Sequence, residues 1–142
     1  MTSILAASDA SESSDPVVAA AIDLGKKIGA EVTVINVLTE QDLVDYRQSL
    51  GAEEAFTDSV ITLINDALTD QITRVAGVPD AARKHVLQGP VGLSLLDHAT
   101  STGADFLALG LRNRSRVGKF LMGSDVQQVL LSTPCPILGI PV

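Results

Sequence analysis

The sequence predicts an α/β domain in which a mostly parallel sheet is flanked by helices. Short aliphatic or β-branched runs alternate with longer segments whose apolar residues recur at helical spacing. Hydrophobic residues make up 46% of the 142 residues but aromatic residues only 3%, so small aliphatic side chains must fill the interior. That composition suits a parallel sheet buried on both faces. The length corresponds to a single domain spanning residues 1–142.

The first part of the chain predicts one strand and one helix. Residues 4–8 form a short apolar strand, and a polar turn follows it. Ser14 or Asp15 can cap the next helix, with Pro16 in its first turn. Gly29 ends that helix, because glycine readily adopts the left-handed conformation common at helix C-termini.

The middle of the chain predicts a strand and a long helix. Residues 32–38 are β-branched and follow the first helix at once, as a strand would. Residues 39–52 read as a loop with a short helix around 42–50. From 53 to 76 the apolar residues lie on one helix face, and Gly77 stops that helix.

The last third predicts three strands and two helices. The strands are residues 85–88, 106–109 and 136–140, and the helices are 91–102 and 124–131. The complete pattern alternates five strands with four main helices, which implies parallel strands and right-handed crossovers. In such folds the ligand crevice lies beyond the carboxyl ends of the strands, where the strand order reverses.

The segment between the fourth strand and the last helix is strongly basic. Residues 110–124 hold four of the ten Lys and Arg residues of a chain whose net charge is -7. These four are Arg112, Arg114, Arg116 and Lys119. A glycine-bounded loop that leads into a helix N-terminus offers free backbone N–H groups and a positive dipole end. We therefore expect this loop to bind an anion, and we expect that anion to be a phosphate group.

Several function classes are disfavoured by composition. An acidic chain lacks the basic surface needed for nucleic-acid or anionic-membrane binding, and no apolar run is long enough to span a bilayer. The absence of a signal-peptide pattern and the single cysteine, Cys135, predict a cytoplasmic protein. His85 and His98 have no ligand-spaced partners, so no metal site is expected.

Several landmarks along nearly the whole chain resemble the universal stress protein family. Residues 4–11 are similar to the family's opening strand, which ends in Asp-Gly-Ser, except that Ala10 replaces the glycine. Gly89-Pro90, residues 104–107 and the ending 134–138 are further landmarks.

The loop after the fourth strand carries the most specific part of this resemblance. Nucleotide-binding members of the family have Gly, two residues, Gly, nine residues, and then Gly-Ser or Gly-Thr. Gly110, Gly123 and Ser124 match this pattern, whereas Asn113 replaces the middle glycine.

The resemblance implies a five-stranded, doubly wound parallel sheet of order 3-2-1-4-5 and a homodimer formed through the last strand. It also implies an adenine nucleotide, ATP or AMP, between the loops after strands 1 and 4, in a protein of stress response that acts on a regulatory partner. Base and ribose would lie near Ala7, Asp9 and Val37. The phosphates would lie near Gly110, Arg112, Asn113, Gly123, Ser124 and Asp125.

Three of these residues leave alternatives open. Asp9 can accept a hydrogen bond from a ribose hydroxyl group or simply stabilise a turn. Asn113 tolerates a left-handed backbone, and its side chain can either fill the phosphate space or donate to a phosphate. The carboxylate of Asp125 interacts favourably with the dipole at the start of a helix, but it repels a phosphate group unless Mg²⁺ bridges the carboxylate and the phosphate.

These alternatives leave three hypotheses for function. The first is a regulatory protein that binds an adenine nucleotide, with Mg²⁺ as an optional counter-ion. The second is a dimeric interaction module without a nucleotide. The third is a slow ATPase, ranked last because the sequence offers no evident general base.

Overall fold

The structure is a computed structural model, and it describes residues 1–50, 56–112 and 124–142. Its strands are β1 (Ser3–Ala7), β2 (Glu31–Leu38), β3 (Arg83–Gln88), β4 (Phe106–Leu111) and β5 (Ile137–Pro141). Its helices are η1 (Glu12–Ser14), α1 (Asp15–Ile28), α2 (Glu40–Leu50), α3 (Phe56–Ala76), α4 (Val91–Thr102) and α5 (Ser124–Ser132). The predicted alternation of strands and helices is confirmed.

The five strands form one parallel sheet in the order β3-β2-β1-β4-β5. This is the order that the family resemblance implies. β1 lies at the centre, with Ala6 paired to Val34 of β2 on one side and to Ala108 of β4 on the other. The loops that follow these three strands therefore emerge at the same edge of the sheet.

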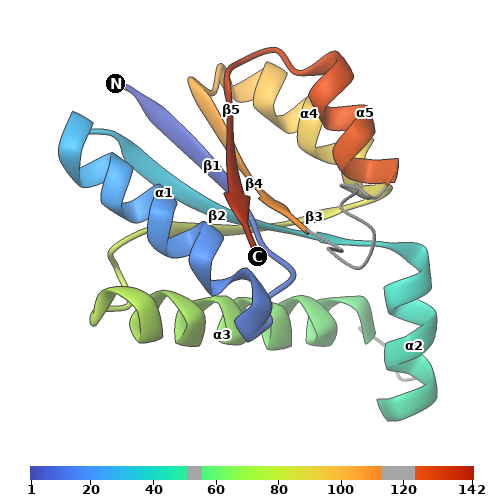
Figure 1. The fold of residues 1–142 in the computed structure, drawn as a ribbon. Helices are drawn as coiled ribbons and strands as arrows, with labels where there is room; N and C mark the ends of the chain where they lie inside the picture. Colours follow the sequence, from blue (N-terminus) through green and yellow to red (C-terminus); the bar gives the residue numbers. More distant parts are fainter. Residues whose placement is uncertain (51–55, 113–123) are drawn as a thin grey trace.

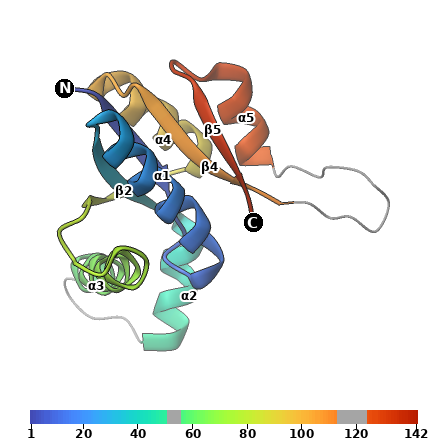
Figure 2. The same cartoon turned by 60° about the vertical axis from the view of Figure 1, so that its left-hand side comes forward.

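Helices cover both faces of this sheet (Figure 1 and Figure 2). On one face, α1 and α3 pack on side chains such as Ile4, Ala6 and Val34. On the other face, the core formed with α4 and α5 includes Leu5 and Leu107. Alternate residues of each strand thus enter different cores, and the burial of these apolar side chains is the main force that holds the layers together. α2 extends away from the sheet at the carboxyl end of β2.

Several element boundaries differ from the sequence prediction. β4 continues two residues beyond the predicted end at residue 109, because Gly110 and Leu111 pair with Ile140 and Pro141 of β5. The prediction that Gly110 opens the loop was therefore wrong. α2 is longer than the predicted short helix around residues 42–50. The first three residues of the predicted helix 53–76 lie outside the described residues.

Helix α1 begins differently from the expected cap. Ser14 occupies the N-cap position and Pro16 the second position of the helix, but the Ser14 side chain makes no capping hydrogen bond. Its hydroxyl group is used in other contacts, described below. Gly29 ends the helix with φ 69°, in agreement with the prediction. Within residues 1–50, 56–112 and 124–142, no helix combines the length and apolarity needed to cross a bilayer.

Candidate functional site

A cavity of about 460 Å³ opens at the carboxyl ends of β1, β2 and β4. It lies where the chain passes from β1 to α1 on one face and from β4 towards α5 on the other, so it occupies the switch point of the sheet. Volumes of this size are typical of small-molecule sites. Helices α2 and α3 contribute a further wall, which includes Tyr46, Leu63 and Ile64.

The cavity brings together six of the nine residues that the sequence singled out for a ligand. They are Ala7, Asp9, Val37, Gly110, Arg112 and Asp125. Ser124 is the first residue of α5, next to Asp125. Asn113 and Gly123 lie outside the described residues, as do Arg114, Arg116 and Lys119.

Gly110 lines the cavity and lies between two other segments of the chain. A β-carbon at this position would come within 3.3 Å of Val17 on α1 and of Val142 at the C-terminus. Glycine therefore lets α1 and the end of the chain approach β4 closely. This packing role accompanies any ligand contact that the residue makes.

Asp9 holds one carboxylate oxygen in a dense set of hydrogen bonds. Oδ1 accepts from the Ser11 backbone N–H at 3.0 Å, from Ser11 Oγ at 2.6 Å and from Ser14 Oγ at 3.0 Å. Burial raises the pKa of Asp9, but these hydrogen bonds and the charge of Arg112 outweigh it, so the pKa is lowered. The group is therefore a charged acceptor at neutral pH.

Ala10 adopts a left-handed backbone with φ 66°. It is the one non-glycine residue with positive φ in the part of the chain that the structure describes. The family that the sequence resembles has glycine here, and glycine adopts such a backbone without steric cost. Alanine instead bears a steric cost, and strain of this kind is often found at ligand sites.

The described lining of the cavity carries more acidic than basic side chains. Asp9, Asp42 and Asp125 supply three carboxyl groups, against the single cationic side chain of Arg112 in the described ranges. The rest of the described lining is largely apolar, with buried Val37, Leu109 and Val129. The cavity therefore offers an apolar region suited to a flat ring and a polar rim of mixed sign.

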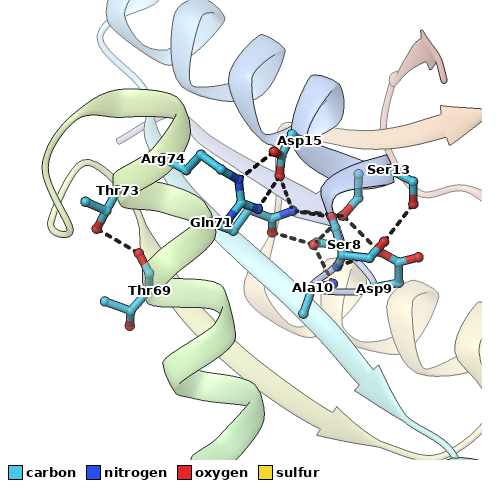
Figure 3. Close-up of polar contacts among 11 residues, drawn as sticks. Ser8, Asp9, Ala10, Ser13, Asp15, Thr69, Gln71, Thr73 and Arg74 are labelled. Atoms are coloured by element: carbon cyan, nitrogen blue, oxygen red, sulfur yellow. Dashed lines mark hydrogen bonds and ion pairs between the residues drawn. The ribbon is translucent and has the colours of Figure 1, made fainter.

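A buried polar cluster that the sequence analysis did not anticipate links the wall of the cavity, at Ser8 and Ser14, to helix α3. Gln71 of α3 is fully buried and contacts Ser8, Ser11, Ser14 and Asp15 (Figure 3). We call Ser8, Ser14 and Gln71 the Gln71 cluster. The signal was present in the sequence, because residue 71 falls on the apolar face of the helix predicted over 53–76. A glutamine on such a face needs hydrogen-bond partners when it is buried.

The remaining chemically reactive side chains lie elsewhere. The rings of His85 on β3 and His98 on α4 stack with their centroids 5.2 Å apart. Burial, assisted by His85, lowers the pKa of His98. Among the described residues, no three His, Cys, Asp or Glu side chains are grouped so that they could hold a metal ion.

Comparison with known proteins agrees with this architecture. A universal stress protein of Mycolicibacterium smegmatis is 32% identical over 136 residues, covering 90% of this chain and 92% of that protein. The structure of a universal stress protein in complex with cAMP has a TM-score of 0.63 at 18% identity, and covers 99% of this chain and 96% of that one. The Archaeoglobus fulgidus protein in complex with dAMP gives 0.62 at 17% identity, with coverage of 99% and 98%.

These two likenesses at low identity establish the fold. The model of the universal stress protein family matches residues 1–141. The chain therefore belongs to the universal stress protein family.

Proposed function

We propose that this protein binds an adenine nucleotide, ATP or AMP, in the cavity at the carboxyl ends of β1, β2 and β4. The observation that carries the proposal is the convergence of a charged acceptor, Asp9, and a cation, Arg112, on one cavity with an apolar interior. A ribose hydroxyl needs an acceptor, a phosphate needs a cation or free N–H groups, and a purine needs apolar walls. Family structures in complex with cAMP and dAMP support this choice of ligand.

The proposed arrangement has the ribose at Asp9 and the phosphates at Arg112 and the start of α5. Ala7 and Val37 would border the base and ribose, and Gly110 and Ser124 the phosphate end. Asn113 and Gly123 would belong to the phosphate end by the family resemblance alone. The first turn of a helix favours a phosphate because its N–H groups are not used within the helix.

Mg²⁺ belongs to this proposal as an optional counter-ion. Asp125 lies in the first turn of α5 and lines the same cavity. Its carboxylate repels a phosphate, and a bridging Mg²⁺ ion would relieve that repulsion. We therefore expect ATP, with its larger charge, to depend on Mg²⁺ more strongly than AMP does.

Titration calorimetry with ATP, AMP and adenosine, each with and without Mg²⁺, tests the proposal. Arg112→Glu should weaken ATP binding by about tenfold or more, because a charge-assisted hydrogen bond is replaced by repulsion. Adenosine binding should change little in this variant, since adenosine has no phosphate. Lys27→Glu is the matched control, because it makes the same change of charge on an exposed residue at the far end of α1.

The second candidate is a dimeric interaction module that binds no nucleotide. The three carboxyl groups that line the described part of the cavity favour it, since they oppose an anionic ligand. Absence of heat at millimolar ATP, with and without Mg²⁺, would favour this candidate and contradict the first.

Homodimerisation, a cytoplasmic location and a regulatory protein partner stay predictions. The edge position of β5 is compatible with a dimer, because an edge strand has unpaired backbone groups on its outer side. Ordering of a loop by a bound nucleotide would offer a way to change a surface that a partner contacts.

A further inference from the structure

The amide of Gln71 joins helix α3 to the loop that carries Asp9. Its Oε1 accepts a hydrogen bond from Ser8 Oγ at 2.6 Å, and its Nε2 lies 2.9 Å from Ser14 Oγ. Nε2 also lies 3.0 Å from the Ser11 carbonyl oxygen and 3.0 Å from Asp15 Oδ1. An amide that is fully buried and in contact with four residues of one segment is well placed to fix the conformation of that segment.

The direction of the hydrogen bonds in the Gln71 cluster follows from the amide. Ser8 has one hydroxyl proton, and it goes to Gln71 Oε1. Ser14 accepts from Gln71 Nε2, so its own proton is free for another acceptor. Ser8 Oγ at 2.9 Å, the Ser11 carbonyl oxygen at 2.9 Å and Asp9 Oδ1 at 3.0 Å are all in reach, and the charged carboxylate is the strongest acceptor of the three.

The consequence is an asymmetric Asp9 carboxylate. Oδ1 receives three hydrogen bonds from Ser11 and Ser14. Within the described ranges no residue donates to Oδ2, which points away from the Gln71 cluster (Figure 3). The residue lines the cavity and is exposed. Among the described residues one oxygen is thus held by three donors, and the other can accept a donor from the cavity.

We propose that Gln71 is a positioning residue which, through Ser14, orients Asp9 so that Oδ2 accepts a ribose hydroxyl. This inference rests on the proposed function, because it assigns the specificity of the same cavity for a ribose over a deoxyribose. Gln71 itself does not line the cavity. Its effect on the ligand is transmitted through Ser14 to the carboxylate.

The experiment compares the affinity for AMP with that for its 2′-deoxy and 3′-deoxy analogues. The wild-type protein should bind AMP about tenfold more tightly than the analogue that lacks the contacting hydroxyl, as expected for one hydrogen bond to a charged group. In Gln71→Leu and in Ser14→Ala, AMP should lose most of that advantage. The affinity for the deoxy analogue should remain close to the wild-type value.

Ile72→Val is the matched control, because Ile72 is fully buried on the same helix and packs in the apolar core. It should weaken packing without removing a hydrogen bond, so the preference for AMP should persist. Equal losses of AMP and deoxy analogue in Gln71→Leu and Ser14→Ala would mean a merely structural role and would overturn the inference. Equal affinities of the wild-type protein for AMP and both analogues would overturn it as well.

A ligand-free measurement separates this inference from the proposed function. The pKa of Asp9, followed by NMR of the labelled carboxyl carbon, should rise in Ser14→Ala, because the ionised form loses a donor. It should also rise in Gln71→Leu, because the Ser14 hydroxyl group is no longer held towards Asp9. It should be unchanged in Ile72→Val. If the wild-type protein binds no nucleotide, the proposed function is wrong, and an unchanged pKa of Asp9 in both variants would overturn the positioning role independently.

Discussion

Two neighbouring loops line the same cavity but are held in place by different means. The loop between β1 and α1 depends on Gln71, which is 57 to 63 residues away from the serines that it contacts. The connection between β2 and α2 is held locally, since Thr39 N–H donates to Asp42 Oδ2 at 2.9 Å and Asp42 N–H donates to Thr39 Oγ1 at 3.1 Å. The first loop thus combines local hydrogen bonds with a buried partner from a distant helix, whereas the hydrogen bonds described for the second loop are local.

This difference predicts how each of the two loops responds to substitution. The buried contacts of the first loop are shielded from water, so each lost partner leaves a polar group that water does not reach easily. Thr39 and Asp42 are only partly buried, so water can replace a lost hydrogen bond there. We therefore expect the first loop to be rigid and sensitive to substitution, and the second to be more tolerant.

The largest effect is expected for Gln71→Leu. The substitution removes an amide whose Oε1 accepts from Ser8 and whose two Nε2 protons serve the acceptors on Ser11, Ser14 and Asp15. The loss of these three hydrogen bonds should lower the free energy of unfolding by about 3 kcal/mol, at about 1 kcal/mol for each. Urea unfolding followed by circular dichroism measures this value. Ile72→Val should lose only about 1 kcal/mol, so a similar loss in both variants would contradict a special role for the Gln71 amide.

A smaller effect is expected for Thr39→Ala in the second loop. The lost cap should cost about 1 kcal/mol, and because α2 extends from the sheet the cost should appear as local opening of that helix. Amide hydrogen exchange in α2 should then be about fivefold faster, the factor that this cost implies. Ser49→Ala near the other end of α2 removes only a bond to the Asp45 carbonyl group and should have little effect. Equal exchange rates in both variants would argue against the cap.

The same contrast explains what the sequence could predict. Strands and helices were predictable because apolar residues repeat at the spacing of each element, and Asp9 was predictable because it follows the first strand. The burial of Gln71 could have been inferred from its place on the apolar face of α3. Its partners could not, since they meet Gln71 only when α3 packs on α1. The end of β4 was missed for a similar reason, as Gly110 and Leu111 become strand residues by pairing with β5.

The smallest change in the free energy of unfolding is expected for a substitution of Ala10, the strained residue of the first loop. Ala10 has φ 66°, and its N–H donates to Ser8 Oγ of the Gln71 cluster at 3.0 Å. A left-handed alanine costs about 1–2 kcal/mol, whereas glycine loses about 0.5–1 kcal/mol more conformational entropy on folding. Ala10→Gly should therefore raise the free energy of unfolding by about 0.5 kcal/mol.

Ala19→Gly gives the matched control, because the same chemical change within α1 should lower the free energy of unfolding by about 1 kcal/mol. Opposite signs for the two variants would confirm the strain at Ala10, and equal losses would refute it. The free energy of unfolding of the double variant Ala10→Gly/Gln71→Leu then shows whether the Gln71 cluster maintains the strain at Ala10. If the Gln71 cluster holds the loop, its removal lets Ala10 relax, and the gain from glycine should disappear in the double variant. A gain that persists without Gln71 would mean that the turn is strained by its own geometry.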